Sequence, residues 1–407
     1  MRGARTLGPN VRTLALRYVL EDVPRLVASL AGIAFAVALV LVQTGIYSGF
    51  VRSTTLLVDN SDADLWVASR AMSYLEITLP IPYSWVAKIG AIDGVQHAEP
   101  LVLRSAIWQS ADGTLDYIRV IGFEPAGSTL RLGASPEALA AMRRGDVATD
   151  AAQLASLHAS GVGARGTIRG LPARVAVITR ASQPIVSPTF LYTSLDSAVA
   201  WTPLSLNEIM DGQHGSGSPI NYVLVRVRSP GSVDTVRASI EHALPGARAF
   251  PRDEMAAITR TFWVERTKIG FLLLLGASLG VFVGGIVVAQ ILYASVNEHL
   301  REYGTLKALG IADRSLYGTI ALQAVTIAAL GYLPGLAIGV AIAFAAAAGR
   351  GTPIEITPQG ALLAFAVALF TCVAAAFLAV QRAVRVDPAL ARVCDWQRWG
   401  SSSSASS

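Results

Sequence analysis

Long apolar stretches alternate with polar segments along this chain. Residues 26–46 contain no charged side chain, and the same is true of residues 269–293, 316–348 and 361–380. A helix of about 20 apolar residues crosses a hydrocarbon core of roughly 30 Å. The pattern therefore predicts four transmembrane helices. The third stretch is longer than one straight crossing needs, and Pro334 within it predicts a kink or a break.

The longest polar stretch, residues 47–268, is predicted to be a domain outside the membrane. Alternating apolar and polar residues predict a hairpin of strands at 102–109 and 115–122, further strands at 64–68, 173–179, 189–193 and 221–228, and helices at 82–89 and 233–244. Residues 126–170 are predicted as helices and loops, and residues 251–268 as a stalk helix that continues without a break into residues 269–293. The expected fold is a membrane α-helical protein with a large mixed α+β extracytoplasmic domain between helices 1 and 2.

Basic residues predict the orientation of the chain. They are frequent in residues 1–25, which form a basic interfacial segment, in the segment 294–315 and in the tail 381–407, whereas the loop 349–360 holds a single arginine. Arginine and lysine accumulate in short loops on the cytoplasmic side of a membrane. We therefore expect both termini to be cytoplasmic and residues 47–268 to be extracytoplasmic.

Glycines recur at every fourth position in two of the apolar stretches. They are Gly276, Gly280 and Gly284 in the second stretch, and Gly331, Gly335 and Gly339 in the third. Small residues at this spacing let helix backbones approach closely in lipid, so we predict that both glycine ladders are helix-packing faces. The first and fourth stretches carry similar alanine-rich spacings, which an alanine-rich helix also produces by chance.

Composition and missing motifs exclude several classes of protein. The chain is 53% hydrophobic and 15% charged, against roughly 25% charged in a soluble protein. The predicted helices lack ionisable residues, which ion-coupled transporters need at depth. No GxxxxGK[ST] P-loop, HExxH or GxSxG motif occurs, so we expect no catalytic residue, no metal site and no cofactor in this chain, and any ATPase must be a separate polypeptide.

The polar segment 294–315 has the pattern of an amphipathic helix on a membrane surface. Its charged residues can face water or a soluble protein, while its leucines turn back toward lipid. An ordinary cytoplasmic loop is the alternative interpretation of the segment taken alone.

The layout and this segment together resemble the FtsX/MacB-type permeases of ABC transporters. The match is carried by EHLREYGTLKALG, that is by Glu298, Arg301, Glu302, Tyr303, Gly304, Leu306, Lys307, Ala308, Leu309 and Gly310. RAVRVDPAL at 382–390 resembles the end of the family, and DADLWVAS at 62–69 looks closest to its DevC-like branch.

The resemblance implies that Glu298, Arg301, Glu302, Tyr303, Gly304, Leu306, Lys307, Leu309 and Gly310 couple the chain to a cytoplasmic ABC ATPase, which would bind ATP and Mg²⁺. It also implies two copies of the permease in a bacterial inner membrane, with residues 47–268 in the periplasm. Relayed motion would then drive an amphiphilic or lipid-like substrate through a periplasmic adaptor, or membrane fusion protein, and an outer-membrane channel. The alternatives are a lipoprotein-releasing permease and a non-transporting regulator of a cell-wall hydrolase or sensor.

Overall fold

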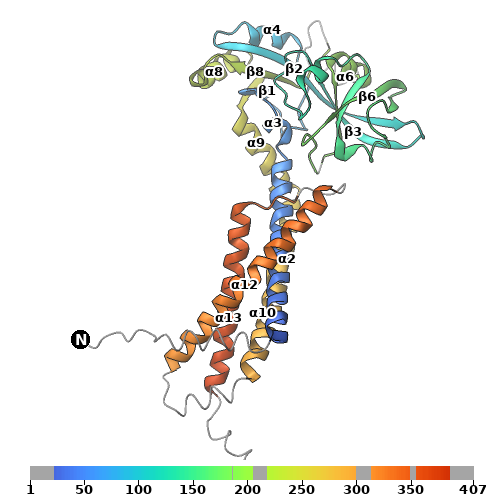
Figure 1. Ribbon diagram of the computed structural model, residues 1–407. Coiled ribbons are helices and arrows are strands. Elements are labelled where there is room, and N and C mark those ends of the chain that lie inside the picture. Colours follow the sequence, from blue (N-terminus) through green and yellow to red (C-terminus); the bar gives the residue numbers. More distant parts are fainter. Residues whose placement is uncertain (1–22, 186, 205–217, 299–312, 349–353, 386–407) are drawn as a thin grey trace, which may run out of the picture. The chain divides into compact units, whose positions relative to one another are not determined.

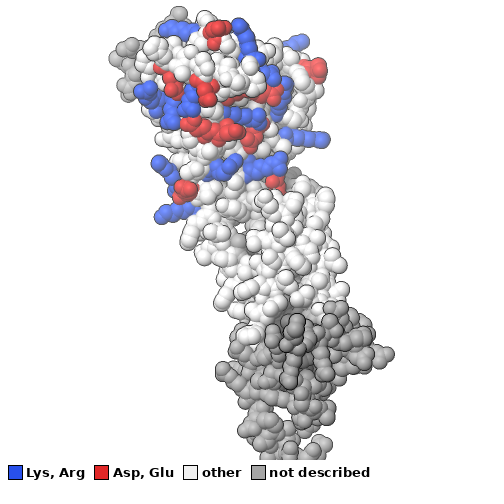
Figure 2. All heavy atoms as spheres, turned by 90° about the vertical axis from the view of Figure 1, so that its left-hand side faces the viewer, with Lys and Arg blue, Asp and Glu red and all other residues white. Residues whose placement is uncertain are grey.

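The computed structural model describes residues 23–185, 187–204, 218–298, 313–348 and 354–385. The chain divides into two compact units. The helical unit consists of Met1–Ser48, Leu272–Gly349 and Pro353–Ser407, and the folded domain of Gly49–Phe271 and Arg350–Thr352. Figure 2 shows that charged side chains gather on the folded domain, while the surface of the described helices in this view is formed by uncharged residues.

Long apolar helices make up the helical unit. They are α2 (Val23–Ser53), α10 (Ile269–Glu298), α12 (Asp313–Ala348) and α13 (Pro358–Arg385) (Figure 1). Within the described residues, three helices are long and apolar enough to cross a membrane, over Leu30–Ser53, Gly270–Val287 and Val325–Ala347. The described apolar part of α13, Pro358–Ala374, is shorter. The count of four spans therefore stays a prediction.

Two of these helices differ from the predicted bounds. Pro334 lies inside α12, which continues to Ala348. The proline therefore does not break the helix, which was one of the two predicted outcomes. The first helix continues beyond residue 46 to Ser53. Its polar last turn is stabilised by hydroxyl groups, because Ser53 Oγ donates to the carbonyl of Phe50 (2.8 Å) and bonds of this kind satisfy carbonyls at a helix end.

Nine strands, all in the folded domain, occur in the described part of the chain. They are β1 (Leu65–Ser69), β2 (Val95–Ser110), β3 (Leu115–Phe123), β4 (Asp146–Asp150), β5 (Arg165–Ile168), β6 (Leu171–Thr179), β7 (Thr189–Ser194), β8 (Tyr222–Val227) and β9 (Ala247–Pro251). Their order in the sheet is β3-β7-β4-β6-β5-β2-β8-β1-β9, and β3 also pairs with β2. This last pairing closes the six strands from β3 to β2 into a barrel, which leaves β8, β1 and β9 as an extension of the sheet (Figure 1).

The long strand β2 belongs to both parts of the sheet. Its first half pairs with β8, as far as Leu101 opposite Tyr222, and its second half pairs with β3 from Val102 opposite Gly122. The predicted hairpin of residues 102–109 and 115–122 is therefore confirmed.

Short helices complete the domain. They are α3 (Leu56–Asp59), α4 (Ser84–Gly90), α5 (Pro136–Ala140), α6 (Leu195–Trp201), α8 (Val233–Ala243) and α9 (Arg252–Thr261), with single turns η1 (Ala151–Gln153), η2 (Pro230–Ser232) and η3 (Phe262–Arg266). The helices predicted at 82–89 and 233–244 correspond to α4 and α8.

The prediction of helices and loops for residues 126–170 is wrong in part, because beside α5 and η1 this region contributes strands β4 and β5 to the barrel. The sequence pattern did not reveal β4, because this strand contains polar residues. Asp146 is buried and accepts hydrogen bonds from Arg174 (2.8 Å), and Asp150 accepts one from the backbone N–H of Ser182 (2.9 Å). A buried carboxylate is tolerated when it is paired in this way, so a fully buried strand here does not look apolar.

The barrel interior is filled by large side chains, among them Trp108 of β2. Its indole is fully buried, and its Nε1 donates to the carbonyl of Leu157 (3.1 Å). A Cβ atom added to Gly166 of β5 would lie 2.3 Å from Cζ2 of this ring. Because real Cβ atoms do not approach that closely, glycine at 166 is what lets the ring lie against the next strand.

The predicted stalk helix is interrupted before α10. The α9 helix passes into the π-helical turn η3 (Phe262–Arg266), and Lys268 then takes a left-handed backbone conformation with φ of 58°. A non-glycine residue in this conformation ends a right-handed helix. The expectation of an unbroken helix from residue 251 into the second apolar stretch is therefore wrong.

Candidate functional site

The predicted ATPase-coupling residues lie almost wholly outside the described part of the chain. Glu298 is the last residue of α10, and the next described helix, α12, begins at Asp313. The other predicted residues fall between these two helices: Arg301, Glu302, Tyr303, Gly304, Leu306, Lys307, Leu309 and Gly310. Their coupling role stays a prediction.

One predicted ladder of glycines lies directly against α2, and we call its members the glycine seam: Gly331, Gly335 and Gly339. A Cβ atom added to Gly335 would lie 2.7 Å from the Cβ of Val37 and 2.8 Å from the backbone carbonyl oxygen of Ala34. A Cβ atom added to Gly331, one turn before, would lie 2.7 Å from Ile33, and one added to Gly339, one turn after, would lie 3.1 Å from Leu41. Even an alanine is therefore too large at the centre of this seam.

The second ladder, on α10, makes looser contacts. A Cβ atom added to Gly276 would lie 3.5 Å from the side-chain oxygen of Gln43, and one added to Gly280 would lie 3.2 Å from Leu39. Gly284 lies in α10, and the neighbouring Gly285, which was not predicted, would approach Thr371 of α13 to 3.4 Å. Of these three distances, the one at Gly280 is tighter than ordinary contact and the other two are ordinary, whereas two of the three seam positions would come within 2.7 Å of a neighbour. The two ladders are therefore not equivalent.

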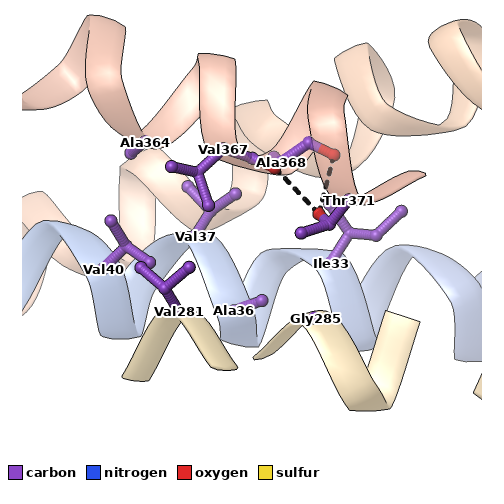
Figure 3. Close-up of a pocket in the computed structure, with 10 residues that line it drawn as sticks. All are labelled: Ile33, Ala36, Val37, Val40, Val281, Gly285, Ala364, Val367, Ala368 and Thr371. Carbon is purple, nitrogen blue, oxygen red and sulfur yellow. Dashed lines mark hydrogen bonds between the residues drawn. The ribbon is translucent and has the colours of Figure 1, made fainter. Parts of the chain in front are cut away.

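The helices α2, α10 and α13 enclose a gap of about 10 Å³ (Figure 3). Its lining is apolar apart from Thr371, whose hydroxyl donates back to the carbonyls of Val367 (2.9 Å) and Ala368 (3.0 Å). A space of this volume is about the size of one water molecule, which would need several polar partners. The gap is thus an imperfection of helix packing and is too small for a substrate.

Three aromatic residues fix the π-helical turn within the folded domain, and we call them the aromatic clamp: Tyr74, Phe262 and Trp263. The Tyr74 and Phe262 rings are stacked, with centroids 3.7 Å apart and an interplanar angle of 9°. Trp263 meets both rings edge-on, at 5.9 Å and 5.8 Å. Burial, with the nearby charge of Glu76 as a second cause, raises the pKa of Tyr74 to about 12, so its hydroxyl stays neutral at physiological pH.

Sequence reasoning did not find the aromatic clamp, although Phe262 and Trp263 are adjacent aromatic residues in a segment otherwise typical of an exposed helix. π-helical turns are rare and occur frequently at functional sites. The clamp ties one side of the turn to the domain, and the left-handed Lys268 follows it directly. This short region is where the path of the chain changes between α9 and α10.

The buried acidic residues of the domain are structural. Glu99 is 1% exposed and accepts hydrogen bonds from the backbone N–H of Thr129 (3.1 Å) and from its hydroxyl (2.6 Å), while His97 lies 3.5 Å away. Among the described residues, no group of three or more His, Cys, Asp or Glu side chains is arranged to hold a metal ion.

Two family models match this chain, one over each part of it. The MacB-like periplasmic core domain matches residues 26–243, which is more than half of the chain, and the FtsX-like permease C-terminal domain matches residues 274–388. The chain belongs to the FtsX/MacB family of permeases. The resemblance noted in the sequence is thereby confirmed at the level of the family, and the DevC-like branch stays a prediction.

Relatives of this FtsX/MacB permease include two named exporters. The macrolide export ATP-binding/permease protein MacB of Rhodospirillum rubrum is 32% identical over 179 residues, which cover 43% of this chain and 27% of that protein. The pyoverdine export ATP-binding/permease protein PvdT of Pseudomonas syringae pv. tomato is 30% identical over 183 residues, covering 44% and 27%. The matched regions thus span about a quarter of the length of these relatives.

Two solved structures share limited similarity with this permease. The periplasmic region of MacB from Actinobacillus actinomycetemcomitans aligns with a TM-score of 0.31 and 16% identity, over 49% of this chain and 91% of that one. The extracellular domain of the ABC-type transporter YknZ from Gram-positive bacteria aligns with a TM-score of 0.33 and 10% identity, over 46% and 98%. The family assignment rests on the family models and not on these alignments.

Membership of the family implies an inner-membrane protein with a periplasmic domain. The long apolar helices near the N-terminus and in the C-terminal half agree with this location. The side of the membrane on which each terminus lies stays a prediction.

Proposed function

We propose that this chain is the permease subunit of an ABC exporter, which passes the ATP-driven motion of a separate ATPase to its periplasmic domain. The observation that carries the proposal is the FtsX-like permease match over residues 274–388, because these residues include the predicted coupling segment. The 407 residues contain no P-loop, so ATP and Mg²⁺ would be bound outside them. In this proposal the permease itself does no covalent chemistry.

The helical unit has features suited to transmitting a displacement. The glycine seam brings the backbones of α2 and α12 close together, which favours movement of the two helices as one body. A displacement at residues 298–310 would enter α10 and reach the domain at Lys268 and the aromatic clamp. In this mechanism the connection works as a joint held on one side by stacked rings, and not as an unbroken rod.

The working assembly would contain two copies of the permease and two ATPase subunits in the inner membrane. A periplasmic adaptor and an outer-membrane channel would complete the path of an amphiphilic or lipid-like substrate. Support for export comes from relatives named for macrolide and pyoverdine export. Apart from Arg52 in the last turn of α2, the described apolar spans carry no Asp, Glu, Lys, Arg or His side chain that could form a polar route through the membrane.

The test uses the full permease, co-expressed with its ATPase and reconstituted in lipid. Glu302→Lys and Gly310→Leu are expected to lower the stimulated ATPase rate at least tenfold while membrane insertion is unchanged. Arg144→Gln, an exposed change in the periplasmic domain, serves as the control and should retain the wild-type rate. Full coupled activity in both coupling variants would show that residues 298–310 are not the coupling segment.

Purification of the detergent-solubilised complex distinguishes the exporter from the other two functions. An adaptor recovered with the ATPase supports export. Recovery of lipoproteins alone would indicate a lipoprotein-releasing permease, and recovery of a cell-wall hydrolase or a histidine kinase would indicate a regulator.

A further inference from the structure

Three exposed cationic side chains lie in and beside the π-helical turn, and we call them the turn cations: Arg260 of α9, Arg266 of η3, and Lys268. Within the described part of the chain, none of the three forms an ion pair or a side-chain hydrogen bond. Glu265 is the single acidic residue between positions 260 and 268. This short segment therefore presents an excess of positive charge to its surroundings.

Other basic residues near α9 are paired, in contrast to the turn cations. Arg237 and Arg248 each lie 2.9 Å from Glu254 of α9, so this carboxylate already serves two arginines. The undescribed residues 349–353, of which 350–352 are grouped with the folded domain, contain one arginine and no acidic residue. They therefore cannot neutralise the turn cations.

The π-helical turn lies at the boundary of an apolar span. The candidate span in α10 begins at Gly270, two residues after Lys268. A Cβ atom added to Gly270 would lie 2.7 Å from the backbone oxygen of Val264, so the turn packs directly against the first residue of the span. The polar head-group layer adds roughly 5–8 Å on each side of a hydrocarbon core of about 30 Å. Arg266 and Lys268 therefore lie at head-group level when α10 crosses the membrane.

Two general preferences disfavour a lysine at position 268. Family membership places the folded domain in the periplasm, whereas arginine and lysine close to a span accumulate on the cytoplasmic side. Lys268 also takes a left-handed conformation (φ 58°), which glycine and asparagine adopt at lower cost. Backbone strain of this kind is found where a side chain has a function, so the positive charge itself is the feature to explain.

We propose that the turn cations bind the phosphate of an anionic phospholipid, such as phosphatidylglycerol, in the periplasmic leaflet. Arg266 and Lys268 pair with the phosphate, and Arg260 adds to the attraction from α9. Each basic residue near a membrane surface strengthens the binding of anionic lipid about fivefold. The bound lipid holds the π-helical turn at the membrane surface. Lipid binding needs no ATPase, so this proposal and the coupling role of residues 298–310 can fail separately.

The experiment uses the full chain in phosphatidylcholine nanodiscs that contain a small fraction of phosphatidylglycerol with a diazirine next to its head group. After irradiation and peptic digestion, mass spectrometry locates the labelled peptides, and labelling elsewhere in the same chain is the internal reference. We expect strong labelling of residues 260–268, and weak labelling there by a phosphatidylcholine probe with the same diazirine. sn-Glycerol 3-phosphate carries the phosphate without acyl chains and should not compete. Competition by it at the concentration of the probe would indicate a site for a soluble anion and overturn the proposal.

The decisive variant combines Arg266→Gln with Lys268→Asn, because asparagine suits the left-handed conformation and both charges are removed. It should lower the labelling of residues 260–268 at least tenfold without lowering the melting temperature in detergent, and Lys268→Arg should keep most of the labelling. Glu265→Gln removes the competing carboxylate and should raise the labelling. Arg144→Gln, an exposed change elsewhere in the folded domain, is the control and should leave it unchanged. Equal labelling of the double variant and the wild type, or equal labelling by the two lipid probes, would overturn the proposal.

Discussion

Glycine makes room for different neighbours in the two units of this permease. In the folded domain, Gly166 makes room for the largest of side chains, the ring of Trp108, which would lie 2.3 Å from an added Cβ. In the helical unit, Gly335 makes room for the facing helix α2, with the Cβ of Val37 2.7 Å and the carbonyl oxygen of Ala34 2.8 Å from an added Cβ. Both positions exclude a side chain, but the closest neighbour is an aromatic ring of the same sheet in one case and the facing helix in the other.

The difference follows from the solvent in which each unit packs. In water, burying a large aromatic side chain is favourable in proportion to the apolar area removed from solvent, at about 25 cal/mol per Å². In lipid the surroundings are as apolar as the side chain, so the same burial gains little. Close backbone approach with dense van der Waals contact then drives association. One residue type thus supports a large core in one unit and close helix contact in the other.

The largest expected effect is in the barrel. Trp108→Ala should destabilise the folded domain by about 3–5 kcal/mol, because it removes a fully buried ring and leaves a cavity. Chemical denaturation of the purified chain, followed by circular dichroism, measures the change. Tyr117→Ala on the opposite face of the same strand pair should change stability by no more than about 0.5 kcal/mol. Similar losses in both variants would mean that the barrel interior does not carry the stability of the domain.

The second-largest expected effect is that of a substitution in the glycine seam. Gly335→Leu should cost about 1–3 kcal/mol, because it inserts atoms where Val37 and the backbone of Ala34 already lie. The loss of α2–α12 contact is measured by cysteine cross-linking between the two helices in native membranes.

Ala345→Leu on the same helix is the control for the seam, since Ala345 is exposed in the described structure and a larger side chain there should be accommodated. If Gly335→Leu cross-links as efficiently as Ala345→Leu, close backbone approach is not what holds α2 and α12 together, and the contrast between the two units fails.

The smallest expected effect is at Lys268, near the end of the folded domain, and its sign is opposite. Lys268→Gly should stabilise the protein by about 1 kcal/mol, because glycine adopts a positive φ without the steric cost that lysine pays. Thermal unfolding of the two proteins in the same detergent measures the difference. A lower melting temperature for Lys268→Gly would indicate that the lysine side chain, and not the backbone conformation, is what matters at this position.

The family and the general layout could be predicted because their signals are local. An uncharged stretch such as residues 26–46 predicts a membrane environment from its own composition, without information from the rest of the chain. The resemblance to the family is likewise found in consecutive residues around Glu302. The hairpin of β2 and β3 was predictable for the same reason, since a short turn joins its strands.

The candidate site was predictable only in part. The spacing of Gly331, Gly335 and Gly339 identified a packing face but not its partner, because spacing says nothing about which helix lies opposite. The aromatic clamp was missed because Tyr74 lies far from Phe262 and Trp263 in the sequence, and only the fold brings their rings together.

The amino-acid sequence alone determined where this chain is apolar, where a polar domain interrupts it and which family it belongs to, because each of these depends on composition over neighbouring residues. The tertiary structure alone decided that β3 meets β2 to close a barrel, that α2 supplies the surface for the glycine seam, and that the chain ends one helix and starts another at Lys268. The barrel and the seam depend on contacts between distant residues, and the turn at Lys268 follows the contacts that hold the aromatic clamp in place. Local periodicity records that a side chain is buried but not what buries it.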